Sequence, residues 1–164
     1  MSTQQAGGHG ARRDRFVQEY QHDSYRMPGK LKEPTVCKEC GALYHKGRWT
    51  WGAKPEGADE IVCPACLRIR DKYPKGLVTL KGSYKDKHRD QVMGVIRNTE
   101  AQEKQEHPLA RIMAIEEQPE GLVVSTTDTH LPRRIGEALK HAHQGELTLR
   151  YEQDEEFVRV TWTA

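Results

Sequence analysis

The chain of 164 residues has no long apolar segment and few aromatic side chains. No apolar run approaches the roughly 20 residues that a membrane-spanning helix needs, so the sequence argues against such a helix. Hydrophobic residues make up 35% of the chain, or about 44% with glycine included, against roughly 45–50% in a typical globular domain. Only 3 Trp, 6 Tyr and 2 Phe are present. We therefore do not expect a single large hydrophobic core.

Signals for secretion and for catalysis are also missing from the sequence. The first ten residues contain no apolar stretch of the kind that forms a secretion signal. The sequence has no glycine-rich phosphate loop, no nucleophile elbow and no HExxH motif. We therefore expect a cytoplasmic protein that is not an enzyme, with neither a membrane nor a small-molecule substrate as its partner.

The chain has only four cysteines, and they form two CxxC pairs. Cys37 and Cys40 are separated from Cys63 and Cys66 by 22 residues. Two thiolates three positions apart on a tight turn can bind one metal ion, and two such turns supply a closed tetrahedral set. Gly41 directly follows the first pair, as expected for a turn that must swing away from the metal. Thiolate ligands in a tetrahedron favour one Zn²⁺ ion, with iron as the main competitor.

A closed four-thiolate site leaves no position for water or substrate, so we expect a structural zinc ion whose binding contributes to folding. Disulfides are not expected in a reducing cytoplasm. The alternative is a redox pair or a zinc-releasing switch, although no βαβ pattern flanks either pair. His45 lies near the first pair and could replace a cysteine, but four thiolates already complete the set.

Charge is distributed unevenly along the chain although the net charge is only +2. Residues 1–99 contain 19 Lys or Arg and 11 Asp or Glu, a net of +8. Residues 100–164 contain 7 and 13, a net of −6. This asymmetry favours contact between the first part and a polyanion, and we predict RNA. The alternative is that two solvated surfaces differ in composition.

Candidate RNA-contacting residues are cations that alternate with aromatic rings. Residues 67–97 carry a net charge of +6, with Tyr73 and Tyr84 interleaved, and rings beside cations suit unpaired bases and phosphates together. In a strand, Trp49 and Trp51 share one face, where they either stack on a base or pack around the zinc site. The predicted RNA contacts are Arg48, Trp49, Trp51, Arg68, Arg70, Lys72, Lys75, Lys81, Lys85, Lys87, Arg89 and Arg97.

Apolar periodicity predicts an α+β fold in four stretches. Residues 1–35 form a polar, basic tail with a short helix around Phe16. Residues 36–80 form the zinc module, a small zinc-ribbon-like unit with hairpin strands near residues 43–44 and 48–51. Residues 81–107 form a basic linker that leads into a helix.

Residues 108–164 are predicted to form a ββαββ domain. Strands are expected at residues 111–115 and 122–126 around a turn at residues 118–121. A helix is expected from Asp128 or Thr129 to Gly145, followed by alternating strands at residues 147–151 and 158–162.

Several of these motifs resemble those of a known family. The whole chain resembles an uncharacterised bacterial family of four-cysteine zinc-ribbon proteins, which implies a zinc ribbon and brings no established activity. More distantly, the cysteine module and its basic linker resemble the zinc-bearing N-terminal region of the large-ribosomal-subunit export adaptor of archaea and eukaryotes. That resemblance implies the four metal ligands and directs attention to ribosomes. The residues that carry the resemblance are Cys37-x2-Cys40-Gly-Ala, Gly47-Arg-Trp-Thr-Trp51, Cys63-Pro-x-Cys66, Arg97-Asn98, His107-Pro108, Arg111-Ile112 and Thr126-Thr127-x2-His-Leu131.

Taken alone, the sequence therefore favours a non-catalytic zinc protein that contacts RNA, with a ribosome or its assembly intermediate as the expected partner. The first alternative is a zinc-stabilised adaptor for protein partners. The second is a DNA-binding regulator, which is disfavoured because no recognition-helix pattern is evident.

Overall fold

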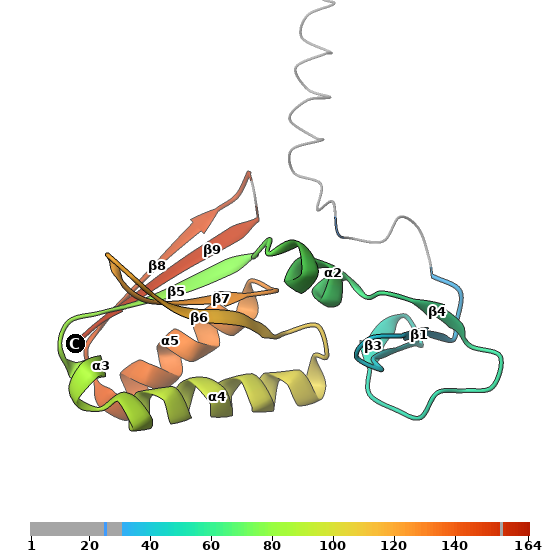
Figure 1. Ribbon diagram of the computed structural model, residues 1–164, viewed down its shortest axis with the longest axis horizontal. Helices are drawn as coiled ribbons and strands as arrows, with labels where there is room; N and C mark the ends of the chain where they lie inside the picture. The colour runs from blue at the N-terminus through green and yellow to red at the C-terminus, as the bar shows by residue number, and fades with distance from the viewer. Residues whose placement is uncertain (1–24, 26–30, 155) are drawn as a thin grey trace, which may run out of the picture.

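The structure is a computed structural model that describes residues 25, 31–154 and 156–164. The short helix expected around Phe16 lies outside these residues. Within the described residues the chain is a mixed α/β protein with two sheets, one of four strands and one of five. The smaller sheet and the larger one lie at opposite ends of the molecule, with the helix α2 between them (Figure 1).

The first sheet belongs to a small unit that we call the cysteine module, residues 35–71. Its strand order is β3-β2-β1-β4, in which β1 is antiparallel to β2 and parallel to β4. These strands are only three residues long, so side-chain packing against them is limited. The elements of the module are β1 (Thr35–Cys37), β2 (Leu43–His45), β3 (Arg48–Thr50), β4 (Asp59–Ile61) and α2 (Pro64–Asp71).

The second sheet belongs to the α/β unit, residues 76–164, and has the strand order β6-β7-β5-β9-β8. Its central strand, β5, is antiparallel to β7 and parallel to β9. The elements of this unit are β5 (Gly76–Lys81), α3 (Tyr84–Lys87), α4 (Arg89–Glu106), β6 (Ile112–Gln118), β7 (Gly121–Thr126), α5 (His130–His143), β8 (Glu146–Glu152) and β9 (Phe157–Thr163).

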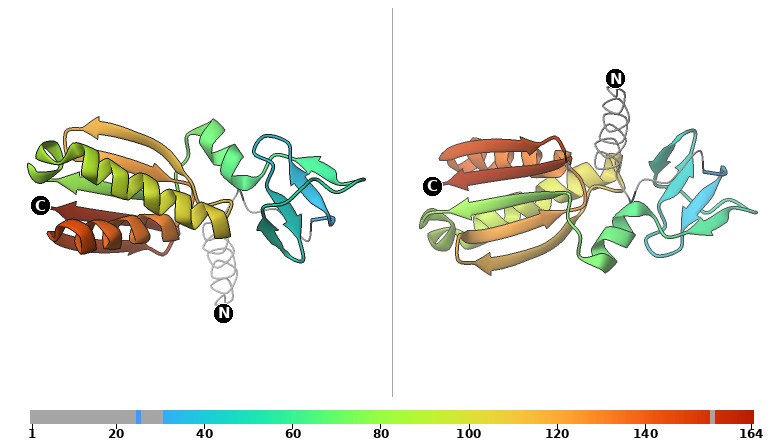
Figure 2. Two further views of the ribbon diagram at one scale, coloured as in Figure 1. Left: turned by 90° about the horizontal axis from the view of Figure 1, so that it is seen from below. Right: turned by 90° about the horizontal axis from the view of Figure 1, so that it is seen from above.

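The two long helices α4 and α5 cover the same face of this sheet (Figure 2). The opposite face carries no helix within the described residues. Because the helices cover one face only, the burial of side chains alternates along β5. Val78 and Leu80 are fully buried toward the helices, while Leu77 and Thr79 are half-buried on the other face. The buried core consists of Val78, Leu80, Val92, Ile96, Leu122, Val124, Leu131, Ile135, Leu139, Val158, Val160 and Trp162.

The helix α5 approaches the sheet closely at one glycine. A Cβ atom at Gly136 would lie 2.7 Å from methyl groups of both Leu147 and Val160, so a larger residue would push the helix away. At the start of the helix, the carboxylate of Asp128 accepts a hydrogen bond from the backbone N–H of Leu131 at 3.0 Å, which satisfies one of the free donors of the first turn. The helix is followed by a turn at Gly145, whose φ is +95°.

The longest described helix, α4, is amphipathic. It buries Val92, Ile96 and Thr99 and exposes Arg89 and Arg97. Neither this helix nor any other in the described residues is long and apolar enough to cross a membrane.

The division of the chain differs from the expected one at β5. Sequence patterns placed residues 76–80 in the zinc module, whereas β5 is the central strand of the second sheet. The helix expected within residues 81–107 is present as α4, and its Val92 and Ile96 are buried in the same core. Residues 108–164 do contain the expected strands and helix, but β7 and β9 each pair with β5 and not with each other. The sheet is therefore incomplete without residues from outside the expected ββαββ domain.

We predict from this topology that a fragment of residues 108–164 does not fold. It lacks β5 and α4, which supply four of the buried core residues, and it leaves facing edges of β7 and β9 unpaired. A fragment of residues 74–164 restores both elements and is expected to fold. Amide dispersion in ¹H–¹⁵N spectra distinguishes the two, and a dispersed spectrum for residues 108–164 would contradict the role assigned to β5.

Candidate metal centre

The four cysteines are positioned by two different local structures. Cys37 ends β1, and Cys40 lies in the tight turn that follows. The turn is closed by two backbone hydrogen bonds, from Cys37 N to Ala42 O at 2.8 Å and from Gly41 N to Cys37 O at 2.9 Å. Gly41 has a φ of +81°, a conformation that glycine adopts without strain, as its position in the sequence suggested.

The second pair opens the helix α2. Cys63 is the N-cap residue, and its sulfur accepts a hydrogen bond from the backbone N–H of Cys66 at 3.4 Å. Pro64 occupies the first turn, where a missing N–H costs nothing. The second pair therefore lies at a helix N-terminus, where the helix dipole favours negative charge.

The four sulfur atoms have the spacing of a tetrahedral metal site. All four lie within 4.8 Å of one another. The sulfurs of Cys37 and Cys66 are 3.8 Å apart, and those of Cys40 and Cys63 are also 3.8 Å apart. A tetrahedron with metal–sulfur bonds of about 2.3 Å has edges of about 3.8 Å, whereas a disulfide requires about 2.05 Å. The cysteines are free, and they can hold one metal ion.

Backbone N–H groups also point at the sulfurs. Cys37 Sγ accepts from Cys63 N at 3.3 Å, and Cys40 Sγ accepts from Ala42 N at 3.5 Å. Burial alone raises the pKa of Cys37, but hydrogen bonds from backbone N–H groups lower it to about 7. Burial raises the pKa of both Cys63 and Cys66. A metal ion binds cysteine as the thiolate, so metal binding at these residues is coupled to proton release.

The side chain of Arg111 completes the site from the α/β unit. One terminal nitrogen donates to Cys66 Sγ at 3.2 Å, and the other donates to Cys40 Sγ at 2.8 Å and to Cys63 Sγ at 3.7 Å. The Nε–H donates to Pro108 O at 2.8 Å, so all three nitrogens of the guanidinium are used. Arg111 is only 7% exposed.

The charge of Arg111 is stabilised by the cysteines. Its burial lowers its pKa, but the hydrogen bonds to Cys66 and Cys40 and the negative charge of the sulfurs raise it overall, so the guanidinium stays protonated. The backbone of Arg111 is held as well, because its N–H donates to Thr127 Oγ1 at 3.0 Å and its carbonyl accepts from Thr127 N at 3.0 Å. The residue therefore joins the sheet of the α/β unit to the metal centre.

Two further contacts join the same parts. Leu109 packs against the buried cysteine cluster. The indole N–H of Trp51 donates to Lys104 O, near the end of α4, at 2.6 Å.

Trp49 packs against the cysteine cluster, with its ring edge-on to Tyr44 at a centroid distance of 5.5 Å. The structure thus places Trp49 in packing, and it leaves Trp51 36% exposed just after β3.

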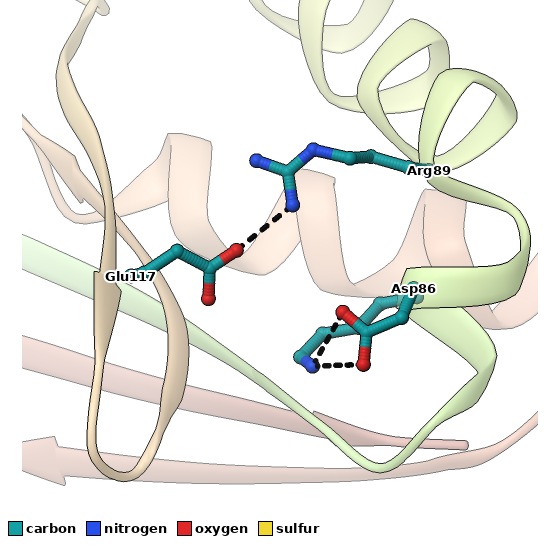
Figure 3. Close-up of polar contacts among 4 residues, drawn as sticks. Asp86, Arg89 and Glu117 are labelled. Atoms are coloured by element: carbon teal, nitrogen blue, oxygen red, sulfur yellow. Dashed lines mark hydrogen bonds and ion pairs between the residues drawn. The ribbon is translucent and has the colours of Figure 1, made fainter.

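The basic residues predicted to contact RNA have different environments. Arg68 is 5% exposed and donates to Tyr73 O at 3.1 Å. Lys85 pairs with Asp86 at 3.1 Å, and Arg89 on α4 reaches Glu117 on β6 at 2.8 Å (Figure 3).

The remaining basic residues predicted to contact RNA either form ion pairs or have no ion-pair partner among the described residues. Lys75, Arg70 and Arg97 pair with Glu156, Asp71 and Glu100. The exposed cations of the predicted set that have no ion-pair partner among the described residues are Arg48, Lys72, Lys81 and Lys87.

The two tyrosines within the basic stretch also differ. Tyr84 is half-buried, with its hydroxyl hydrogen-bonded to His143 Nδ1 at 2.9 Å and its ring packed edge-on against Trp162. Tyr73 is 59% exposed at the end of α2 and stacks on Tyr25.

Comparison of the chain with models of protein families, with curated proteins and with solved structures found no match. The family resemblances noted from the sequence stay predictions, and the site is interpreted from its own geometry. Sequence reasoning found the four cysteines that can hold a metal ion, but it did not find the role of Arg111. No pattern around Arg111 indicates its sulfur partners 45, 48 and 71 residues away.

We predict that the purified protein holds one metal ion per chain and that Cys63→Ser weakens metal affinity roughly 100-fold or more, since changes to residues that merely hydrogen-bond to ligands already cost 10–100-fold. Elemental analysis gives the stoichiometry, and competition with a chromogenic chelator gives the affinity. Protein purified without chelator that contained no metal would contradict the site.

We predict that Arg111→Met lowers the free energy of unfolding by about 3–5 kcal/mol, because it leaves buried negative charge without its partner. Urea unfolding at a fixed free-metal concentration measures the change. The matched control is Arg134→Met, because the Arg134 side chain is 64% exposed and its charge stays in contact with solvent although its partner Glu103 is only 17% exposed. We expect that substitution to cost about 1 kcal/mol. Equal effects of the two substitutions would contradict the role of Arg111.

Proposed function

We propose that this chain is a zinc-stabilised, non-catalytic protein that contacts RNA, with ribosomes or their assembly intermediates as the expected partner. The observation that supports the metal is the grouping of four sulfurs within 4.8 Å of one another, with two sulfur–sulfur distances of 3.8 Å that match the edges of a tetrahedral site. Four thiolates favour Zn²⁺ or iron among the biological metals, and a complete set of four protein ligands is typical of a structural zinc ion.

The RNA contact is proposed at the end of α2, on a surface that we call the α2 patch: Ile69, Arg70, Lys72 and Tyr73. All four residues are exposed. Tyr73 has the largest exposed fraction, 59%, among the exposed large hydrophobic residues. Tyr73 stacks on Tyr25, and its ring is still largely exposed close in sequence to Arg70 and Lys72. An exposed ring beside cations can stack on an unpaired base while the cations contact phosphates. The ion pair of Arg70 with Asp71 is exposed and therefore exchanges readily for a phosphate.

The metal centre and the α2 patch belong to one helix. Cys63 and Cys66 fix the N-terminal end of α2, and the patch lies at its C-terminal end. At that end Lys72 adopts the left-handed conformation, with a φ of +54°, and the Tyr73 N–H donates to Arg68 O at 3.0 Å. In this proposal the zinc ion orients the RNA contact without touching RNA, and no residue performs a chemical step.

Sedimentation of tagged protein through a sucrose gradient tests the partner. Co-sedimentation with ribosomal particles that is lost after nuclease treatment or at high salt supports the proposal, because phosphate contacts are salt-dependent. Association that survives both treatments would point to a protein adaptor instead.

We predict distinct signatures for the two kinds of residue in the α2 patch. Lys72→Gln should reduce the slope of log K against log salt by about 0.7, the single-strand value for one lost phosphate contact. Tyr73→Ala should cost about 1–3 kcal/mol of binding with the slope unchanged, because a stacked base carries no net charge. Titration of single-stranded RNA at several salt concentrations measures both.

Two variants serve as controls for this experiment. Tyr73→Phe keeps the ring and should bind like the parent protein. Lys140→Gln removes an exposed cation from α5, far along the chain from the patch, and should leave the slope unchanged. If neither Lys72→Gln nor Tyr73→Ala weakens RNA binding, the proposed contact is refuted. That result would not bear on the metal centre.

A further inference from the structure

The strand β8 is an open edge of the five-stranded sheet. It spans seven residues, Glu146–Glu152, and pairs only with β9 among the described strands. Two of its apolar side chains, Leu149 and Tyr151, are 48% and 49% exposed. An exposed edge strand offers a row of free backbone N–H and C=O groups to another strand.

The opposite edge of the sheet, β6, is protected. Its register shifts between Ile112 and Ala114, which disturbs the regular ladder. Its second half carries the exposed acids Glu116 and Glu117, and Glu120 follows in the turn. Bulges and charges of one sign are the usual means of preventing edge pairing. The charges on β8 are of both signs, so they favour a strand that places opposite charges across from them. They do not repel every approaching strand.

We propose that β8 pairs with β8 of a second copy of this chain, antiparallel and centred on Thr148. With helices of both copies on the same side, Glu146 of each copy then lies opposite Arg150 of the other, and Thr148 lies opposite Thr148. This inference does not depend on zinc or on RNA.

The charges on β8 favour this register over those centred on residues 149 and 150. Glu146 and Arg150 are exposed, and neither has an ion-pair partner among the described residues. Centring the pair on residue 149 would place Glu146 opposite Glu152, and centring it on residue 150 would place Arg150 opposite itself. Like charges directly opposite one another destabilise a sheet, and opposite charges stabilise it.

Within one chain, the neighbours of Arg150 on the sheet leave its charge without an acidic partner among the described residues. Arg150 lies directly opposite Arg159 of β9. The carboxylate of Glu152 pairs with Arg159 at 3.0 Å, which compensates the charge of Arg159 alone. Glu146 of a second copy would supply the carboxylate that Arg150 lacks.

The helix-side face of β8 is complementary in the same register. Leu147 and Leu149 alternate with the charged residues, so Leu147 of one copy lies opposite Leu149 of the other. In this register Tyr151 of one copy lies opposite Gly145 of the other, which comes directly before the strand. Pairing therefore covers the two exposed apolar side chains of the strand.

Charge reversal tests both the partner and the register. Sedimentation velocity over a range of concentrations should show a dimer for the parent chain. Glu146→Arg and Arg150→Glu each place like charges opposite one another twice per dimer, and each should weaken dimerisation roughly tenfold or more. The double variant restores both pairs and should dimerise like the parent.

A mixture of the two single variants should also form a dimer, because each acidic side chain then faces a basic one. This mixing experiment controls for misfolding, since a variant that fails to fold cannot be rescued by its counterpart. Arg133→Glu, on α5, is the matched control and should leave dimerisation unchanged. A parent chain that stays monomeric at every concentration, or a dimer unaffected by all the reversals, would overturn the proposal.

Cross-linking tests the register itself. Thr148→Cys places two thiols across the symmetry axis, so oxidation should link two chains through residue 148. Arg150→Cys faces Glu146 of the other copy and should not form this link. The parent chain, with its four cysteines gathered at the metal centre, reports any background. Efficient linking through residue 150 but not through residue 148 would overturn the register.

Discussion

The contact between the guanidinium of Arg111 and the cysteine sulfurs is the interaction on which the arrangement of the whole chain depends. Four thiolates around a divalent cation carry a net negative charge, and burying that charge without a partner is costly. Arg111 supplies the positive charge within 2.8 Å of Cys40 Sγ and 3.2 Å of Cys66 Sγ. The contact of Arg111 with the four cysteines therefore joins the cysteine module to the α/β unit.

The helix α2 and the strand β5 extend this constraint along the chain. α2 begins at the cysteines, ends at the exposed α2 patch, and is followed within a few residues by the central strand of the larger sheet. The cysteines and the α2 patch therefore lie at the two ends of one helix. The fold decides which cations of the basic stretch are available to a partner. Arg68 is buried, and Lys85 and Arg89 form ion pairs with acidic side chains. The cations that stay exposed and unpaired are fewer than the composition suggests.

Local patterns were sufficient for most of the individual elements. Alternation of apolar residues located β8 and β9, and the turn at residues 118–121 located β6 and β7. A helical repeat that follows Asp128 and Thr129 located α5, and the CxxC spacing located the four cysteines that can hold a metal ion. Local patterns failed for β5, whose short apolar run suits either part of the chain. Its place between β7 and β9 depends on pairing with strands more than 40 residues away in sequence.

The sequence by itself therefore determined which cysteines can hold a metal ion and the identity of most local elements, because cysteine spacing, caps and apolar periodicity are properties of neighbouring residues. The tertiary structure alone decided which strand is central, which tryptophan packs against the cysteines and which arginine balances their charge. Arg111 meets Cys40 across 71 positions of sequence. Such a contact leaves no periodic or spacing signal, since it exists only when the sheet of one unit places that side chain against the turn of the other.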